Sequence, residues 1–307
     1  MRRRNDRAHT IKLIRCLTVL IQERPDIFER NQLHRIYESA FVDKAGRQVF
    51  AGATGGIATV DTGLAERIFN QVFAEEGKIS QLAAVNSLQR SVQSHPAFTL
   101  SVGPKIVDAY LRQHEAGVLD NYIVVLRLIP KGNSAALLIS LEKWFTASVV
   151  AQLDSKIVSE LLTVLKIACE SNPRVAFTVS QRIEILDKGI AGGLAALYDN
   201  VSEHSKDVDL LSEVLTAFGK IAGYPQLRMG NALRRSLPRL ARQLGSSPVI
   251  QMVMRAYPEV KDEQALRSLF RAAFAIPGWS ERENAQLLKD KNLPGSIRGL
   301  LSTRIIQ

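Results

Sequence analysis

Residues 155–169 read Ser-Lys-Ile-Val-Ser-Glu-Leu-Leu-Thr-Val-Leu-Lys-Ile-Ala-Cys, the pattern of an amphipathic helix. At 100° per residue, the apolar side chains fill an arc of about 160°, wider than the ~100° stripe of an ordinary surface helix. A stripe of this width predicts neighbouring helices on two sides, as for an inner helix of a stack. The apolar positions are Ile157, Val158, Leu161, Leu162, Val164, Leu165 and Ala168.

The end of this helix, from Thr163 to Cys169, is one of four stretches with a short apolar core closed by a small or helix-breaking residue. The others begin at Val124, Thr216 and Arg271, so successive starts are 39, 53 and 55 residues apart. These separations lie near two, three and three multiples of a unit of ~18 residues, about one helix with its turn. The spacing predicts an all-α fold, specifically an α-solenoid of stacked antiparallel helix pairs.

Breaker residues divide the 307-residue chain into three expected parts. Residues 1–44 contain basic N-terminal helices, and residues 45–63 hold five glycines and little charge, which is typical of a flexible loop or a short hairpin. Residues 64–307 form the helical repeat array, with apolar segments mostly 10–20 residues long between Gly and Pro breakers. Aromatic residues make up only 6%, which suits packing of helix on helix better than a sheet.

The two cysteines and the hydropathy pattern exclude several classes of protein. Cys16 and Cys169 lie 153 residues apart on apolar faces, so neither a disulfide framework nor a zinc knuckle is indicated. No apolar run approaches the ~18 residues of a membrane span, so we expect none.

Motifs of catalysis are missing from the sequence. It contains no G-x-S-x-G elbow, Walker A loop, G-x-G-x-x-G, H-E-x-x-H or EF-hand pattern, and its five histidines are scattered singly. The glycines at 52–56 resemble a phosphate loop but lack the Lys-Ser/Thr that would hold phosphates and a metal. We therefore predict a protein without catalytic residues, metal or cofactor.

The net charge of +10 is concentrated at the two ends of the chain. Residues 1–35 carry nine Lys/Arg and four Asp/Glu, and residues 220–307 carry 15 and six. The basic start resembles a mitochondrial targeting segment. Its Leu13, Ile14, Leu17, Leu20 and Ile21 also form the stripe of a first core helix, and the two interpretations are compatible.

The 45 residues from Val214 to Pro258 contain seven bases and no acid. Within Gly230–Leu244, leucines recur on one face of a predicted helix, and arginines occupy the opposite face. Six of the seven bases are Arg, whose guanidinium binds phosphate bidentately and stacks on bases, so we expect contact with single-stranded or ribosomal RNA. On a following helix, Arg267 and Arg271 form an i, i+4 pair that would extend this row of arginines. The predicted RNA-binding residues are Arg228, Arg234, Arg235, Arg239, Arg242, Arg255, Arg267 and Arg271.

Two other interpretations of this arginine face stay open. A charged helix face is often only solvated, and within a large assembly it often docks an acidic protein.

A recurring sequence pattern runs through Leu210–Tyr224, Gly245–Tyr257 and Asp262–Phe274. In this pattern Ser-Pro precedes an apolar helix that contains Ala-Tyr, and an acidic residue precedes the next apolar helix. Across about residues 155–275 the chain resembles the octotricopeptide and heptatricopeptide repeats of organellar proteins, the latter associated with RAP domains. That resemblance implies mitochondrial or plastid RNA metabolism.

We therefore expect a non-enzymatic subunit of a mitochondrial ribonucleoprotein in the matrix, either an RNA processing or editing complex or the mitoribosome, with other protein subunits as partners. The alternative is a scaffold subunit of an organellar complex such as an energy-transducing assembly, with the arginine face against an acidic protein.

Overall fold

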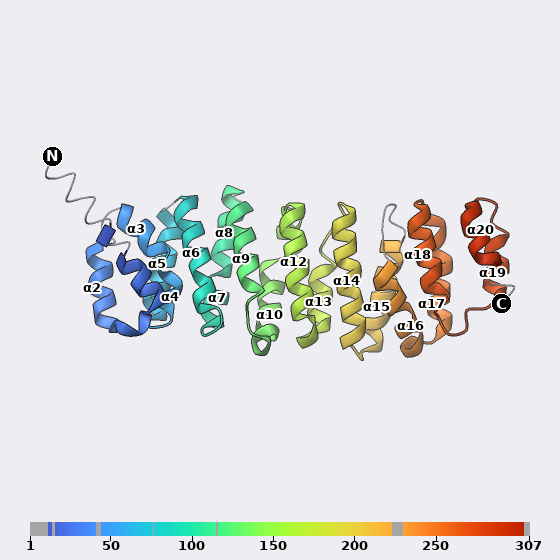
Figure 1. Ribbon diagram of the computed structural model, residues 1–307, viewed down its shortest axis with the longest axis horizontal. Helices are drawn as coiled ribbons and strands as arrows, with labels where there is room; N and C mark the ends of the chain where they lie inside the picture. Colours follow the sequence, from blue (N-terminus) through green and yellow to red (C-terminus); the bar gives the residue numbers. More distant parts are fainter. Residues whose placement is uncertain are drawn as a thin grey trace. The chain divides into compact units, whose positions relative to one another are not determined.

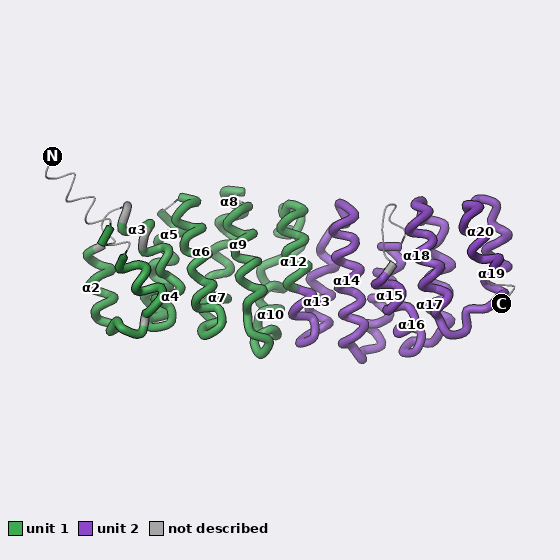
Figure 2. Tube along the Cα trace, in the orientation of Figure 1, with its two compact units in different colours: residues 1–164 green, residues 165–307 purple. Residues whose placement is uncertain are grey.

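In a computed structural model of the chain, the structure describes residues 12–13, 16–40, 44–75, 77–114, 116–222 and 230–303. All regular secondary structure in these ranges is helical, which confirms the predicted all-α class. Figure 1 labels these helices along the chain. The chain divides into two compact units, residues 1–164 and 165–307 (Figure 2). This division lies inside the predicted repeat array rather than at residues 45–63.

Unit 1 is built from short helices that begin after a helical segment at residues 16–23. Its helix α4 contacts α5 and α6, and α6 also contacts α9. Its elements are η1 (Pro25–Ile27), α2 (Arg30–Ala40), α3 (Lys44–Ala51), α4 (Thr54–Ala58), α5 (Thr62–Glu75), α6 (Lys78–Ser91), α7 (Pro96–Ser101), α8 (Gly103–Gln113), α9 (Ala116–Leu126), η2 (Lys131–Asn133), α10 (Ser134–Trp144), α11 (Ala147–Val150) and the greater part of α12 (Ser155–Ala168).

Unit 2 arranges its central helices in two layers. Helix α16 contacts α14 and α18 in one layer, α15 contacts α17 in the other, and α16 packs against both α15 and α17. The elements after α12 are η3 (Cys169–Ser171), α13 (Pro173–Ser180), α14 (Lys188–His204), α15 (Val208–Ala222), α16 (Gly230–Leu244), α17 (Ser246–Ala256), η4 (Tyr257–Glu259), α18 (Glu263–Ala273), α19 (Glu281–Leu288) and α20 (Gly295–Ser302).

Side-chain caps start several helices of unit 2 at the breakers seen in the sequence. The Asn172 carboxamide oxygen accepts a hydrogen bond from the Val175 N–H at 3.2 Å, with Pro173 in the first turn of α13. Asp187 and Asp262 cap α14 and α18 in the same way. These caps satisfy N–H groups that have no partner within the helix, so they fix where these three helices begin. The expected breaker Gly192-Gly193 instead lies inside α14, and Pro238 lies inside α16.

The apolar stripe of α12 is buried as predicted. All seven apolar side chains that form this stripe in residues 155–169 are less than one-tenth exposed. In unit 2 the core continues around Tyr198, whose ring centroid lies 5.4 Å from that of Phe177 and 5.6 Å from that of Phe218. The wide apolar stripe of α12 is therefore buried across its whole width.

The flexible loop predicted for residues 45–63 is wrong, because the segment is helical and largely buried. The first residues of the segment belong to α3, and all five residues of α4 are buried. A Cβ added to Gly55 would lie 1.8 Å from the Ser87 carbonyl oxygen of α6, and one added to Gly56 would lie 2.6 Å from the Ile21 carbonyl oxygen. The glycines therefore serve close approach of backbones rather than flexibility.

Asp61 ties α2 to the start of α5. Its carboxylate accepts hydrogen bonds from the Arg30 guanidinium at 2.6 Å, His34 at 2.9 Å and the Leu64 N–H at 3.0 Å. Burial acts to raise the pKa of the Asp61 carboxyl, but the hydrogen bonds from Arg30, Leu64 and His34 together outweigh it and hold that pKa well below its usual range. The charged form of Asp61 therefore stabilises unit 1.

No single helix among those described has the length and hydropathy of a membrane span. One pair, Ala116–Leu126 and Lys131–Trp144, reaches that composition only when its two parts are taken together across a bend of 111°.

Candidate nucleic-acid interface

Helix α16 shows the predicted separation of leucines from arginines. Leu233, Leu237 and Leu240 are fully buried, whereas Arg234 and Arg242 are exposed. Among the described residues, neither of these two arginines forms an ion pair with a carboxylate; the Arg242 Nε donates only to the Pro238 carbonyl oxygen, at 3.3 Å. Both guanidinium groups are thus available to a binding partner.

Arg239 does not face solvent, and the prediction that it does is wrong. Its side chain is 23% exposed, and its Nη1 donates to the Asp199 carbonyl oxygen at 3.1 Å and to the Ser202 hydroxyl at 3.2 Å. Its Nη2 also lies 3.8 Å from a carboxylate oxygen of Glu203. Arg239 therefore joins α16 to α14 and is a structural residue.

The reason for this placement is a buried carboxylate on α14. Asp199 is 3% exposed, and its Oδ1 accepts a hydrogen bond from the buried Ser236 hydroxyl at 2.8 Å. The Arg235 Nε lies 3.3 Å from Asp199 Oδ2, yet the Arg235 side chain stays 67% exposed. Arg235 therefore neutralises a buried acid at one end and keeps an accessible guanidinium edge.

The remaining predicted arginines do not form one continuous row. Arg255 is exposed on α17, in the other layer of unit 2. On α18, Arg267 lies 3.4 Å from Glu263, while Arg271 is exposed beside it. Arg228 lies outside the described residues. Part of the predicted row of arginines therefore lies on α16 and α18, whereas Arg255 lies on a different surface.

A groove of about 520 Å³ follows α14, α16 and α18. Its apolar lining consists of small residues, Gly192, Ala195, Ala196 and Ala232, which leave room between the helices. Its exposed or half-buried polar residues are Lys166, Asn200, Asn231, Arg235, Gln264 and Ser268. We call these residues together the α14–α16–α18 groove.

Three carboxamides recur along this groove at almost equal intervals. Asn200, Asn231 and Gln264 come from three successive helices of one layer, 31 and 33 residues apart. Asn200 donates to the Lys166 carbonyl oxygen at 3.3 Å, whereas within the described residues neither Asn231 nor Gln264 has a side-chain hydrogen bond. The charge pattern of the sequence does not point to these uncharged residues. Their recurrence as polar positions on every second helix is the signal that does.

Arg235 and Arg242 share the solvent side of α16 with Asn231. At 100° per residue these three positions fall within an arc of about 40°. All three are exposed. Asn231 and Arg235 line the groove, and Arg242 lies about two turns further along the same face. A ligand that extends beyond the groove along α16 would therefore meet a second guanidinium group.

The described residues contain no group of three or more His, Cys, Asp or Glu side chains that could hold a metal ion. Burial raises the pKa of the Cys169 thiol to about 12, which makes this cysteine a poor nucleophile. The chemistry that this surface supports is binding through charge and hydrogen bonds.

Comparison of the chain with protein-family models, with curated proteins and with solved structures finds no match. The resemblance to octotricopeptide and heptatricopeptide repeats therefore stays a prediction.

Proposed function

We propose that this chain is a non-enzymatic RNA-binding protein with an α-solenoid architecture of antiparallel helix pairs, and that the α14–α16–α18 groove binds single-stranded RNA. The two layers of unit 2 and the successive contacts within each layer support this architecture. The observation that carries the binding proposal is the regular recurrence of carboxamides beside exposed cations in one groove.

The chemistry of the groove fits a chain of repeating units that each carry a negative charge and a hydrogen-bonding edge. Arg235 offers a guanidinium fork to phosphates and Lys166 adds an ammonium group within the groove, and the exposed Arg242 offers a second fork about two turns further along α16. The amides of Asn231 and Gln264 donate and accept, as needed for the exposed edges of unstacked bases. Single-stranded RNA presents both groups in alternation, whereas an acidic protein surface presents carboxylates without base edges.

The buried acid in the groove does not oppose this role. The Asp199 carboxylate is shared between the Ser236 hydroxyl and the arginines at 235 and 239. A carboxylate held in this way is screened from a bound phosphate and fixes the position of the Arg235 guanidinium.

The test is binding of fluorescein-labelled single-stranded RNA to the full chain at several salt concentrations. Each phosphate contact adds about 0.7 to the slope of log affinity against log salt for single strands, so replacing Lys166, Arg235 and Arg242 with Ala together should lower that slope by about 2. Arg239 is left intact because it joins α16 to α14.

The matched control removes three exposed lysines outside the groove, Lys188, Lys206 and Lys289. It changes the net charge by the same amount and should leave most of the affinity in place. Equal losses in the two triple variants would show that binding is diffuse and would refute the groove as the site.

The carboxamides are tested separately with homopolymers. Asn231→Ala and Gln264→Ala should change the preference among poly(A), poly(U) and poly(C) while leaving the salt slope unchanged, because an amide contacts a base and not a counterion. An unchanged preference in both variants would exclude base contact through these amides.

Membership of a mitochondrial ribonucleoprotein is a further part of the proposal. It predicts that the tagged protein is found in the mitochondrial matrix and that its partners are lost after nuclease treatment. Partners that persist after nuclease treatment would favour the scaffold alternative.

A further inference from the structure

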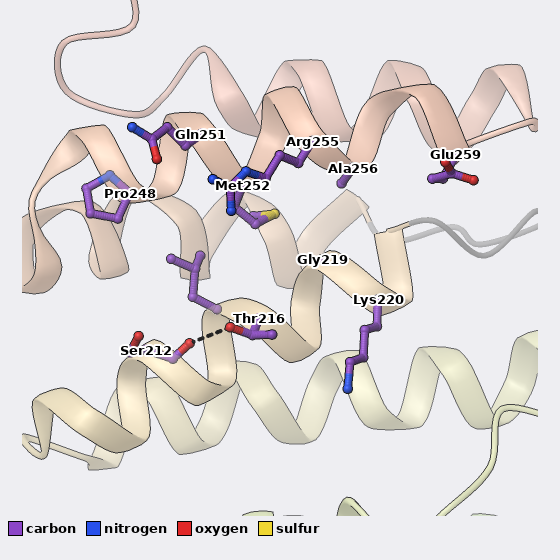
Figure 3. Close-up of a pocket in the computed structure, with 11 residues that line it drawn as sticks. Ser212, Thr216, Gly219, Lys220, Pro248, Gln251, Met252, Arg255, Ala256 and Glu259 are labelled. Atoms are coloured by element: carbon purple, nitrogen blue, oxygen red, sulfur yellow. Dashed lines mark hydrogen bonds between the residues drawn. The ribbon is translucent and has the colours of Figure 1, made fainter.

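The second layer of unit 2 contains a separate groove, between α15 and α17, that the RNA-binding proposal does not use (Figure 3). Its volume is about 450 Å³, within the ~300–1,000 Å³ of typical binding pockets. Leu215 and Gly219 of α15 line it with Pro248, Met252 and Ala256 of α17. We call this surface the α15–α17 groove.

The floor of the groove is formed by Leu215, Met252 and Ala256, which are each less than one-tenth exposed, and the exposed polar residues Ser212, Thr216 and Gln251 line it beside them. A Cβ added to Gly219 would lie 3.5 Å from Met252 Cγ, an ordinary contact, so nothing larger than a methyl group fits there without entering the groove. Pro248, Met252 and Ala256 are spaced four residues apart, as are Leu215 and Gly219. Rows of this spacing are the ridges between which another helix packs.

The walls of the groove carry positive charge. Lys220 and Arg255 are exposed at its rim, and neither pairs with a carboxylate among the described residues. Both walls come almost entirely from the acid-free stretch of residues 214–258. One carboxylate, that of Glu259, lies at the end of the groove. The surface is therefore complementary to an occupant that is apolar on one side and acidic at its flanks.

We propose that the α15–α17 groove binds an acidic amphipathic helix of a partner protein. Apolar side chains of that helix rest on Leu215 and Met252, and its carboxylates meet Lys220 and Arg255. The occupant is a helix because the floor offers no free backbone groups to an extended peptide, whereas a helix satisfies its own N–H and C=O groups. The α17 row from Pro248 to Ala256 spans about 12 Å, which is about two helical turns.

The experiment uses the full chain and a designed fluorescein-labelled peptide of about 16 residues, long enough for four helical turns. Leu residues recur on one face of the peptide at helical spacing, and Glu residues flank them. A second peptide carries Lys in place of each Glu, and a third carries Ser in place of each Leu. Fluorescence anisotropy should show binding of the first peptide and not of the other two.

Two variants test the floor of the groove. Gly219→Leu places a side chain in the groove and should weaken binding of the acidic peptide by about tenfold or more, as for loss of a binding hot spot. Gly219→Ala is the matched control, because a methyl group fits against Met252, and it should bind like the wild type.

A charge reversal tests the walls and does not depend on the folding of Gly219→Leu. The double variant Lys220→Glu/Arg255→Glu should lose the acidic peptide and gain the basic one, while reversal of Lys188 and Lys206 should leave both affinities unchanged. The Lys166/Arg235/Arg242 alanine variant should also bind the acidic peptide normally, which separates this proposal from RNA binding.

Failure of the acidic peptide to bind, or binding that ignores the charge reversal, would overturn the proposal. Displacement of the peptide by poly(U) at equal charge concentration would assign the groove to nucleic acid instead and would also overturn it.

Discussion

Substitution of Gly55 by Ala should destabilise unit 1 by about 1–5 kcal/mol. The new Cβ would lie 1.8 Å from the Ser87 carbonyl oxygen, whereas real Cβ contacts keep at least 3.0 Å. Helices α4 and α6 must therefore separate by about 1.2 Å at this point, since the clash is with backbone and no rotamer relieves it. That separation also stretches the hydrogen bond from the Gly55 N–H to the Ser87 hydroxyl, now 2.9 Å.

The magnitude combines three effects. Overpacking in a core costs about 1–3 kcal/mol. Loss of a buried hydrogen bond costs about 1–3 kcal/mol, and the better helix propensity of Ala returns about 1 kcal/mol. Urea denaturation followed by circular dichroism measures the difference from the wild type.

Two further variants identify the cause. Ser87→Ala removes the hydrogen bond but adds no atom, so it should cost less than Gly55→Ala. Gly117→Ala, also in unit 1, should be neutral or slightly stabilising, because the nearest atom to its Cβ is Lys78 Cε at 3.8 Å. Equal stability of Gly55→Ala and Gly117→Ala would refute the close-approach explanation.

Three more predictions follow from buried groups. Asp61→Asn should cost about 1–3 kcal/mol at pH 7; because the pKa of Asp61 is lowered on folding, this difference should shrink as pH falls below about 4 in urea titrations. Asp199→Ala should lower the free energy of unfolding by about 3 kcal/mol, measured by thermal or urea unfolding. In a double-mutant cycle with Arg239→Ala, the loss of stability in the double variant should be smaller than the sum of the losses in the two single variants. In native protein at pH 8, iodoacetamide should modify the exposed Cys16 and spare the buried Cys169, as read by mass spectrometry, because burial raises the pKa of the Cys169 thiol to about 12.

The helical class was predictable because the hydrophobic period is a local property of the chain. The stripe of α12 and the leucine face of α16 can be read within fifteen residues, and both are buried in the structure. The role of Gly55 could not be read in this way, because it depends on Ser87, 32 residues away. A glycine that permits flexibility and a glycine that permits close packing look identical in sequence.

The difference between local patterns and contacts distant in sequence also explains which arginines of α16 were predicted correctly. Local periodicity placed Arg235, Arg239 and Arg242 opposite the leucines and Arg234 at the border of the leucine stripe, and the structure confirms the exposure of Arg235 and Arg242. It failed for Arg239, because the acid that neutralises it lies 40 residues earlier on α14. Absence of acids within a stretch of sequence therefore does not establish that its bases are free.

The acid-free stretch of residues 214–258 contributes to two surfaces of unit 2 rather than one. Its helices alternate between the layers, so Arg235 lines the α14–α16–α18 groove, with Arg242 about two turns further along α16, while Lys220 and Arg255 border the α15–α17 groove. The two grooves also differ in their lining: the first has small residues and three carboxamides, whereas the second has Leu215 and Met252 at its floor and one carboxamide, Gln251. If both proposals hold, one run of basic sequence binds RNA on one layer and an acidic helix on the other. Charge changes in one groove should then leave binding at the other within about twofold in a solution of moderate salt, where fields between exposed charges are screened beyond about 10 Å.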